Sequence, residues 1–142
     1  MGRAVLTAPD TAAPDTRAAV LAYLDALNAH DPDRIAACVA EDFVNEHTSA
    51  MGHNRYGRAE YRAALERFIA DFADLHYELE DLLVEADRAS AAYRMSFRLV
   101  SRGNAPVSVR GVFRFRVDAT GLIAHRVDYW DSGEVTRQLP AG

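Results

Sequence analysis

In the first half of the chain, apolar residues recur at the three- and four-residue spacing of helices that bury one face. This pattern predicts a first helix over residues 16–29. A second, short helix is expected to begin at Asp31 and Pro32 and to run to about Val39, because aspartate caps helix N-termini and proline is tolerated at the first helical position. The third predicted helix is marked by one apolar face, which consists of Tyr61, Leu65, Phe68, Ile69 and Phe72.

Further along the chain the period of the pattern falls to two, which is typical of antiparallel strands with one apolar and one polar face. Alternating segments begin at Leu75, Tyr93 and Val107, and a last strand is expected to end at about Ser132. A short strand at residues 43–47 precedes the third helix. Helices first and a meander of strands afterwards predict an α+β domain, in which a strongly curved antiparallel sheet and three N-terminal helices enclose a cone-shaped pocket.

The 142 residues, 49% of them hydrophobic, fit a single domain over residues 16–138, with tails at 1–15 and 139–142. No apolar run approaches the length of about 20 residues that a membrane span needs, and the first residues do not resemble a signal peptide. With Cys38 as the one cysteine, no intramolecular disulfide can form, so we expect a cytoplasmic location and a structural thiol. The net charge of −5 disfavours nucleic acid as a main partner.

Several motifs appear in an order that is typical of one superfamily. They are the segment from Tyr23 to Asp31, Ala40-Glu41-Asp42-Phe43, Gly111-Val112-Phe113-Arg114-Phe115, Gly121-Leu122-Ile123 and Asp128-Tyr129-Trp130-Asp131. Over residues 17–138 the chain resembles the nuclear transport factor 2-like superfamily, which includes ketosteroid isomerases, limonene epoxide hydrolases and SnoaL-like polyketide cyclases. The resemblance implies a cystatin-like α+β barrel. It leaves the reaction open, because this fold carries unrelated chemistries.

The resemblance to ketosteroid isomerases implies half of their hydrogen-bonding site. Tyr23 falls where those enzymes keep a tyrosine that donates a hydrogen bond to the forming enolate. The position of their second, acidic donor falls on Gly111, and the position of their basic aspartate falls on His47. An orthodox ketosteroid isomerase activity is therefore not expected.

The resemblance to epoxide hydrolases is also incomplete. Those enzymes activate water with an aspartate–arginine–aspartate set, of which one aspartate is kept as Asp128. The arginine and the other aspartate fall on Tyr93 and Met95, while the accompanying tyrosine and asparagine fall on Asn45 and His47. The water-activating set of that branch is therefore not complete here.

If the apolar set of each strand faces inward, a few polar groups converge on a mostly apolar pocket. We expect His47 to act as general base or acid, Asp128 to orient it or to be the base, and Tyr23 to donate to a substrate oxygen. Arg94 is expected to point to the opposite face of the sheet. The expected substrate-binding residues are Asn45, Tyr93, Met95, Phe97, Phe113, Phe115 and Trp130.

These residues also have a structural interpretation, in which the polar groups satisfy one another and the aromatic residues fill the core. The functional interpretation is acid–base chemistry on a small hydrophobic molecule: isomerisation, cyclisation, dehydration or epoxide hydrolysis, without a cofactor or a metal. The alternatives are a non-catalytic ligand-binding domain and a dimerisation module. No membrane partner is expected.

On the other face of the sheet, a row of arginines alternates with the pocket-facing residues. They predict cross-strand ion pairs with Glu78, Glu80 and Asp131, or the interface of a homodimer. Val112, Val127 and Tyr129 would form the apolar centre of that interface. The arginines are Arg94, Arg98, Arg110, Arg114 and Arg116.

Overall fold

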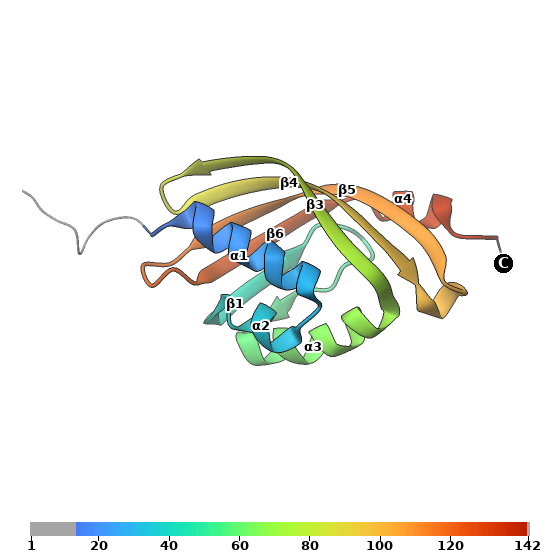
Figure 1. Ribbon diagram of the computed structural model, residues 1–142, viewed down its shortest axis with the longest axis horizontal. Coiled ribbons are helices and arrows are strands. Elements are labelled where there is room, and N and C mark those ends of the chain that lie inside the picture. The colour runs from blue at the N-terminus through green and yellow to red at the C-terminus, as the bar shows by residue number, and fades with distance from the viewer. Residues whose placement is uncertain (1–13, 142) are drawn as a thin grey trace, which may run out of the picture.

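The computed structural model describes residues 14–141, and it places three helices against one face of a single curved sheet (Figure 1). The predicted N-terminal tail therefore lies almost wholly outside the described residues. These helices are α1 (Thr16–Ala29), α2 (Pro32–Ala36) and α3 (Arg58–Asp71). A further helix, α4 (Ser132–Gln138), follows the last strand.

Aspartate side chains fix where the helices begin. The carboxylates of Asp15 and Asp31 accept backbone N–H groups at the starts of α1 and α2, as the sequence predicts for Asp31. α2 ends earlier than predicted, because Val39 already belongs to the first strand. The predicted last strand also ends early, because Asp131 caps an unpredicted fourth helix by accepting the N–H of Gly133 at 2.8 Å.

Six strands form one sheet in the order β2-β1-β6-β5-β4-β3. The strands are β1 (Val39–His47), β2 (Arg55–Tyr56), β3 (Phe72–Glu85), β4 (Arg88–Leu99), β5 (Ala105–Val117) and β6 (Ile123–Trp130). The sheet is mixed rather than wholly antiparallel, because β1 pairs in parallel with β6, while β3 to β6 form the predicted antiparallel meander. The early strand β1 thereby brings its side chains next to those of the last strand.

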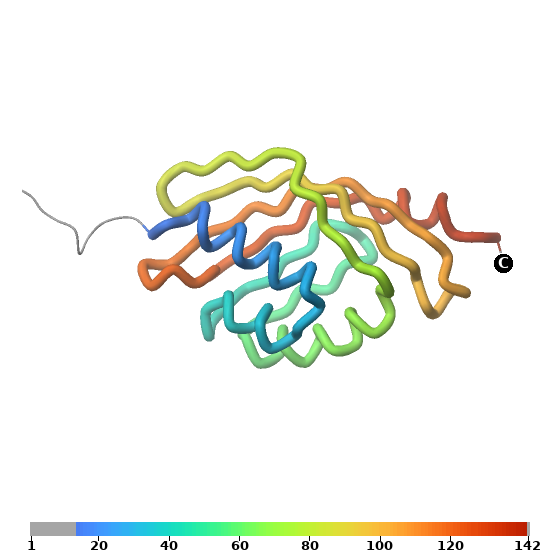
Figure 2. Tube along the Cα trace, viewed as in Figure 1, coloured from blue at the N-terminus to red at the C-terminus, as the bar shows by residue number. Residues whose placement is uncertain are grey.

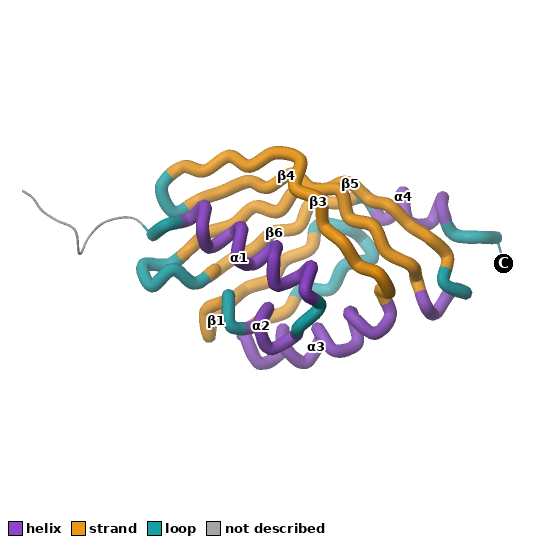
Figure 3. Tube along the Cα trace, viewed as in Figure 1, coloured by secondary structure: helices purple, strands orange, loops and turns teal. Residues whose placement is uncertain are grey.

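The sheet curves around the helices and gives the predicted cone. α1 lies across the sheet, and α2 and α3 lie on the same side, as Figure 3 shows in purple and orange. The chain trace in Figure 2 shows the turn of the β3–β4 hairpin beside the start of α1. Thr16 at this start donates its hydroxyl to the carbonyl of Ala86 in the hairpin turn at 2.6 Å, which ties the helix to the sheet.

Strand alternation follows the predicted register. Tyr93 is 1% exposed in the core, whereas its neighbour Arg94 lies on the outer face. There Glu80 contacts Arg94 at 3.6 Å and Arg110 at 3.0 Å, so cross-strand ion pairs form on this face. Exposed pairs of this kind stabilise a fold by only about 0–1 kcal/mol each.

Two further sequence expectations concern the single thiol and the absence of a membrane span. Half-buried Cys38 follows α2, its thiol donates to the carbonyl of Arg34 at 3.4 Å, and burial raises the thiol pKa, which fits a structural role. None of the helices within residues 14–141 is long and apolar enough to cross a membrane.

Candidate active site

A cavity of about 440 Å³ lies between α3 and the concave face of the sheet. Most of its wall is apolar, and this part is made by Leu27, Leu65, Phe68, Phe72, Met95, Phe97, Leu99, Val109 and Val135. Polar side chains gather where β1 and β6 meet, and those that line the cavity include Asn45, His47, Arg126, Asp128 and Trp130. A mostly apolar hollow with a few converging polar groups is typical of a site for a small molecule.

Asp128 is the buried carboxylate of this site and is 6% exposed. The hydroxyl of Tyr93 donates to Oδ1 at 2.6 Å, whereas Oδ2 has no hydrogen bond within residues 14–141. Burial raises the pKa of Asp128, although the charge of Arg126 and the hydrogen bond from Tyr93 oppose this effect. One oxygen of a carboxylate with increased proton affinity is thus left free at the cavity.

His47 lies at the end of β1, directly opposite Asp128 in the register of β1 and β6. The two side chains share the cavity, with Nδ1 of His47 3.5 Å from Oδ2 of Asp128. However, Trp130 donates its indole N–H to the same Nδ1 at 3.1 Å, so this nitrogen acts as an acceptor and carries no proton. The contact with Asp128 is therefore not an ion pair.

Electrostatics also keep His47 neutral. Burial, followed by the charges of Arg126, His53 and Arg55, lowers the pKa of His47 to about 3. A group with such a pKa has little affinity for a proton at neutral pH, so it is a weak general base. The structure brings His47 and Asp128 together as expected, with the His47 imidazole neutral at pH 7.

Arg126, for which the sequence predicted no role, is the buried cation of the site and is 4% exposed. Its Nη1 donates to the Tyr23 hydroxyl at 2.6 Å, and its guanidinium lies 4.5 Å from the ring centre of Phe113. Among the described residues, no carboxylate lies within 4.0 Å of it. The sequence contains a signal for this residue. Arg126, Asp128 and Trp130 are two positions apart on one strand, so their side chains must lie on the same face of the sheet.

The Tyr23 side chain contacts Arg126 and Tyr61. Its hydroxyl accepts from Arg126 and lies 2.5 Å from the hydroxyl of Tyr61, and it does not line the cavity. Burial raises the pKa of both tyrosines, so both keep their protons. When Tyr23 donates to Tyr61, the proton of Tyr61 remains available at the cavity wall. Of the two tyrosines, Tyr61 therefore has its side chain at the cavity.

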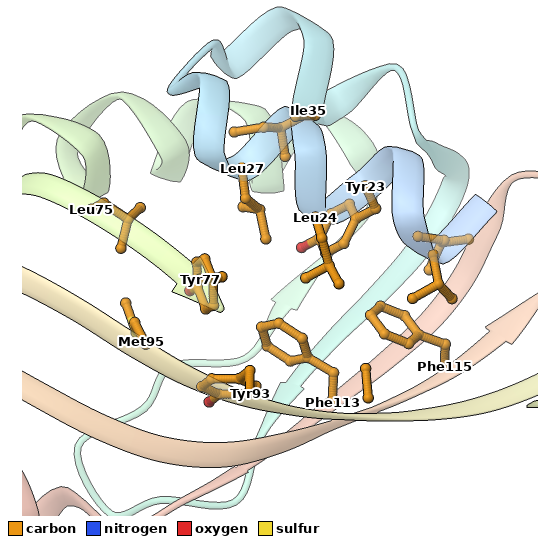
Figure 4. Packing of buried hydrophobic residues seen from close by; sticks show 14 of the residues in the cluster. Tyr23, Leu24, Leu27, Ile35, Leu75, Tyr77, Tyr93, Met95, Phe113 and Phe115 are labelled. Carbon is orange, nitrogen blue, oxygen red and sulfur yellow. The ribbon is translucent and has the colours of Figure 1, made fainter. Parts of the chain in front are cut away.

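The remaining predicted binding residues fall into two groups. Asn45, Tyr93, Met95, Phe97 and Trp130 line the cavity. Phe113 and Phe115 do not line it. They are 0% and 1% exposed and pack beneath α1, facing Tyr23 and Leu24 in Figure 4, because α1 covers that end of the sheet.

Gly111 also lies outside the cavity lining, and the ring of Tyr93 on the neighbouring strand fills the space beside it. A Cβ atom on Gly111 would lie 2.6 Å from Cζ of Tyr93 and 2.7 Å from the carbonyl oxygen of Tyr129. A larger residue at position 111 is thus incompatible with the hydrogen bond from Tyr93 to Asp128.

Solved structures share this architecture. A hypothetical protein with a ketosteroid isomerase-like fold from Catenulispora acidiphila, in complex with trimethylamine, matches with a TM-score of 0.79 and 20% identity over 88% of this chain and 95% of that one. TsrD from Streptomyces laurentii matches with a TM-score of 0.73 and 28% identity over 89% and 95%. SalBIII, an epoxide hydrolase/cyclase-like enzyme of pyran ring formation in salinomycin, matches with a TM-score of 0.74 and 20% identity over 84% and 92%.

Sequence comparison gives the family. A comparison with curated proteins finds no match. The family model described as a SnoaL-like domain matches residues 20–126, and both the predicted cone fold and the predicted superfamily are confirmed. The chain therefore belongs to the SnoaL-like domain family.

Proposed function

We propose that this protein is a cofactor-independent enzyme that moves protons on a hydrophobic small molecule, with Asp128 as the general base. The observation that supports this most strongly is the free Oδ2 of Asp128 at the wall of a mostly apolar cavity. A base is most effective when its pKa lies near the working pH, and burial moves the pKa of Asp128 in that direction.

The site is suited to removing a proton from a carbon next to a carbonyl group. Asp128 takes the proton, the electron pair of the C–H bond moves toward the carbonyl oxygen, and that oxygen accepts a hydrogen bond from Tyr61. Returning the proton to another carbon gives isomerisation. Attack of the enolate carbon on a second carbonyl group forms a ring, and the resulting alkoxide takes the proton back from Asp128. The Arg126 charge supports Tyr61 through Tyr23, because a hydroxyl that accepts from a cation becomes a stronger donor.

The other polar residues of the site act on Asp128 or on the ligand. Tyr93 holds Oδ1 of Asp128 and leaves Oδ2 to the substrate. His47 accepts from Trp130 and so fixes the indole at the cavity wall. The family and its neighbours, which include the epoxide hydrolase/cyclase-like SalBIII, support ring-forming or isomerising chemistry.

A non-catalytic ligand-binding protein is the second candidate. It is favoured by the lowering of the His47 pKa to about 3, which removes one of the two expected acid–base groups at neutral pH. Such a protein would bind its ligand in the same cavity and release it without chemical change.

The test compares turnover of a panel of apolar ketones, diketones and epoxides by the wild type and by Asp128→Asn. We expect the variant to lose about 10²–10⁴-fold in rate, which is the typical effect of removing a general base. Asp81→Asn, which alters an exposed carboxylate on β3, serves as the control and should retain full activity. Equal turnover of any converted compound by Asp128→Asn would reject the assignment, and binding without conversion would favour the second candidate.

A further inference from the structure

The guanidinium of Arg126 is under-coordinated for a buried cation. It carries five N–H donors, and Nη1 donates to Tyr23 at 2.6 Å. Nη2 lies 3.5 Å from Nε2 of His47, a weak contact, because His47 carries its proton on that nitrogen. In the part of the chain that the structure describes, Nε has no hydrogen-bond partner.

The nearest carboxylate does not neutralise this cation directly. Asp128 is the next inward-facing residue on β6, but Tyr93 occupies its Oδ1, and no oxygen of Asp128 lies within 4.0 Å of the guanidinium. Burying a charge without a directly paired counter-charge is unfavourable. The guanidinium of Arg126 thus has capacity left for an anion that enters the cavity.

A second polar group without a partner lies beside it. Asn45 is directly opposite Arg126 in the register of β1 and β6, is 4% exposed and lines the cavity. Its Oδ1 is buried without a hydrogen bond among the described residues. Its NH₂ group has no hydrogen bond among the described residues either, so this amide can supply an anion beside Arg126 with a second donor.

The charges along the cavity wall are unequally distributed. Arg55 and His53 also line it near His47, on the same side as Arg126. Besides Asp128, the acidic residue that lines it is Asp71, whose carboxylate accepts the backbone N–H of Ser101 at 2.8 Å and its hydroxyl at 3.1 Å. The end of the cavity formed by β1 and β6 is therefore the cationic end, and the aromatic residues Phe68, Phe72 and Phe97 line its apolar part.

We propose that the ligand of this cavity is an apolar carboxylic acid, whose carboxylate accepts hydrogen bonds from Arg126 and Asn45 while its hydrocarbon part lies along the aromatic wall. Guanidinium and carboxylate form charge-assisted pairs that are stronger than neutral hydrogen bonds. A volume of about 440 Å³ lies within the range of small-molecule pockets. The inference rests on the proposed function only in naming this acid as the substrate, since binding needs no turnover.

The protein contains its own reporter of binding. Trp130 is its one tryptophan and lines the cavity, so its fluorescence reports the occupant. The probes are two pairs of matched shape, decanoate with decanamide and phenylbutyrate with phenylbutyramide. We expect each acid to bind the wild type at least about tenfold more tightly than its amide, because the amide lacks the charge that pairs with Arg126.

Three variants test which residues cause the preference for acids over amides. Arg126→Met should abolish the preference for the acid over the amide, whereas Arg88→Met, at an exposed arginine of β4, should leave both affinities unchanged. Asp128→Asn removes a negative charge beside the carboxylate and should increase the preference for the acid over the amide. If Arg126→Met does not fold, which circular dichroism shows, the wild type and Asp128→Asn decide the question.

Equal affinity of the wild type for the acids and their amides overturns the proposal, as does a folded Arg126→Met that still prefers acids. The two proposals fail separately. Loss of turnover in Asp128→Asn without any preference for acids leaves the general base in place and rejects the acid ligand. A preference for acids with unchanged turnover in Asp128→Asn does the reverse.

Discussion

The indole N–H of Trp130 donates to Nδ1 of His47 at 3.1 Å, and this bond decides which imidazole nitrogen carries the proton. Protonation of Nδ1 would break the bond. Burial, followed by the charge of Arg126, lowers the pKa of His47 to about 3. The histidine that the family resemblance places at the base position is thus held neutral by its neighbours.

The first prediction concerns the titration of His47. We expect its imidazole NMR signals to show a neutral ring with the proton on Nε2 from pH 8 down to pH 4, since the pKa lies near 3. Because this pKa is below the unfolded-state value of 6.5, the group stabilises the fold fully above pH 6.5, and this stability is lost as the pH falls toward 3. His47→Gln identifies the signals. A midpoint near 6.5 would contradict the assigned bond.

The second prediction separates the two buried tyrosines. Tyr61→Phe loses one hydrogen bond between neutral hydroxyls, whereas Tyr23→Phe loses that bond and also the bond from Arg126. Hydrogen bonds to charged groups contribute about 1.5–3 kcal/mol, so we expect Tyr23→Phe to lower the free energy of unfolding by about that much more than Tyr61→Phe. Urea unfolding measures both variants. Equal destabilisation would mean that Tyr23 does not hold the guanidinium.

The third prediction links stability to Asp128. Its pKa in the folded state is above the unfolded-state value of 3.8, so its ionisation opposes folding. This opposition is absent below pH 3.8 and complete above the folded-state pKa. We therefore expect Asp128→Asn to unfold at the same temperature as the wild type, or at a higher one, at pH 7. The difference should vanish as the pH falls to 3.8.

Thermal unfolding of Asp128→Asn between pH 3.5 and pH 8 checks this sign, with Asp81→Asn as the exposed control. A buried polar group that lowers stability at its working pH is typical of a functional site. A melting temperature of Asp128→Asn below that of the wild type at every pH would show that the carboxylate supports the fold instead.

The fourth prediction concerns Gly111→Ala. The added Cβ would lie 2.6 Å from Cζ of Tyr93, so the ring must move and release Oδ1 of Asp128. Overpacking of this kind destabilises by about 1–3 kcal/mol. The pKa of Asp128 should also rise further, because the bond from Tyr93 lowers it. A variant with unchanged stability and an unchanged carboxyl titration would exclude this role of Gly111.

Much of the fold was predictable because the signals are local. Helix α1 and the alternation around Tyr93 follow from the spacing of neighbouring residues. The parallel pairing of β1 with β6 was not predictable, because it joins segments about eighty residues apart, such as His47 and Asp128. Helix α4 was also missed, because it is short and contains Gly133, a poor helix former.

The candidate site was predictable only where it depends on strand alternation. Alternation places Asp128 on the cavity side of β6. The same rule places Arg126, two positions earlier, on that side too. The separation of Tyr23 from the cavity depends on how α1 packs, and no spacing within the sequence encodes it. The state of His47 depends on Trp130, a residue more than eighty positions away.

The central claim is that Asp128 is a carboxylate whose affinity for protons is increased by burial. Carbon-13 NMR titration of the side-chain carboxyl groups, in the wild type and in Asp128→Asn, measures this without a substrate. The signal that is lost in the variant should titrate clearly above the usual value of 3.8. A midpoint at or below 3.8 would contradict the claim, because the carboxylate would then be too weak a base for the proposed chemistry.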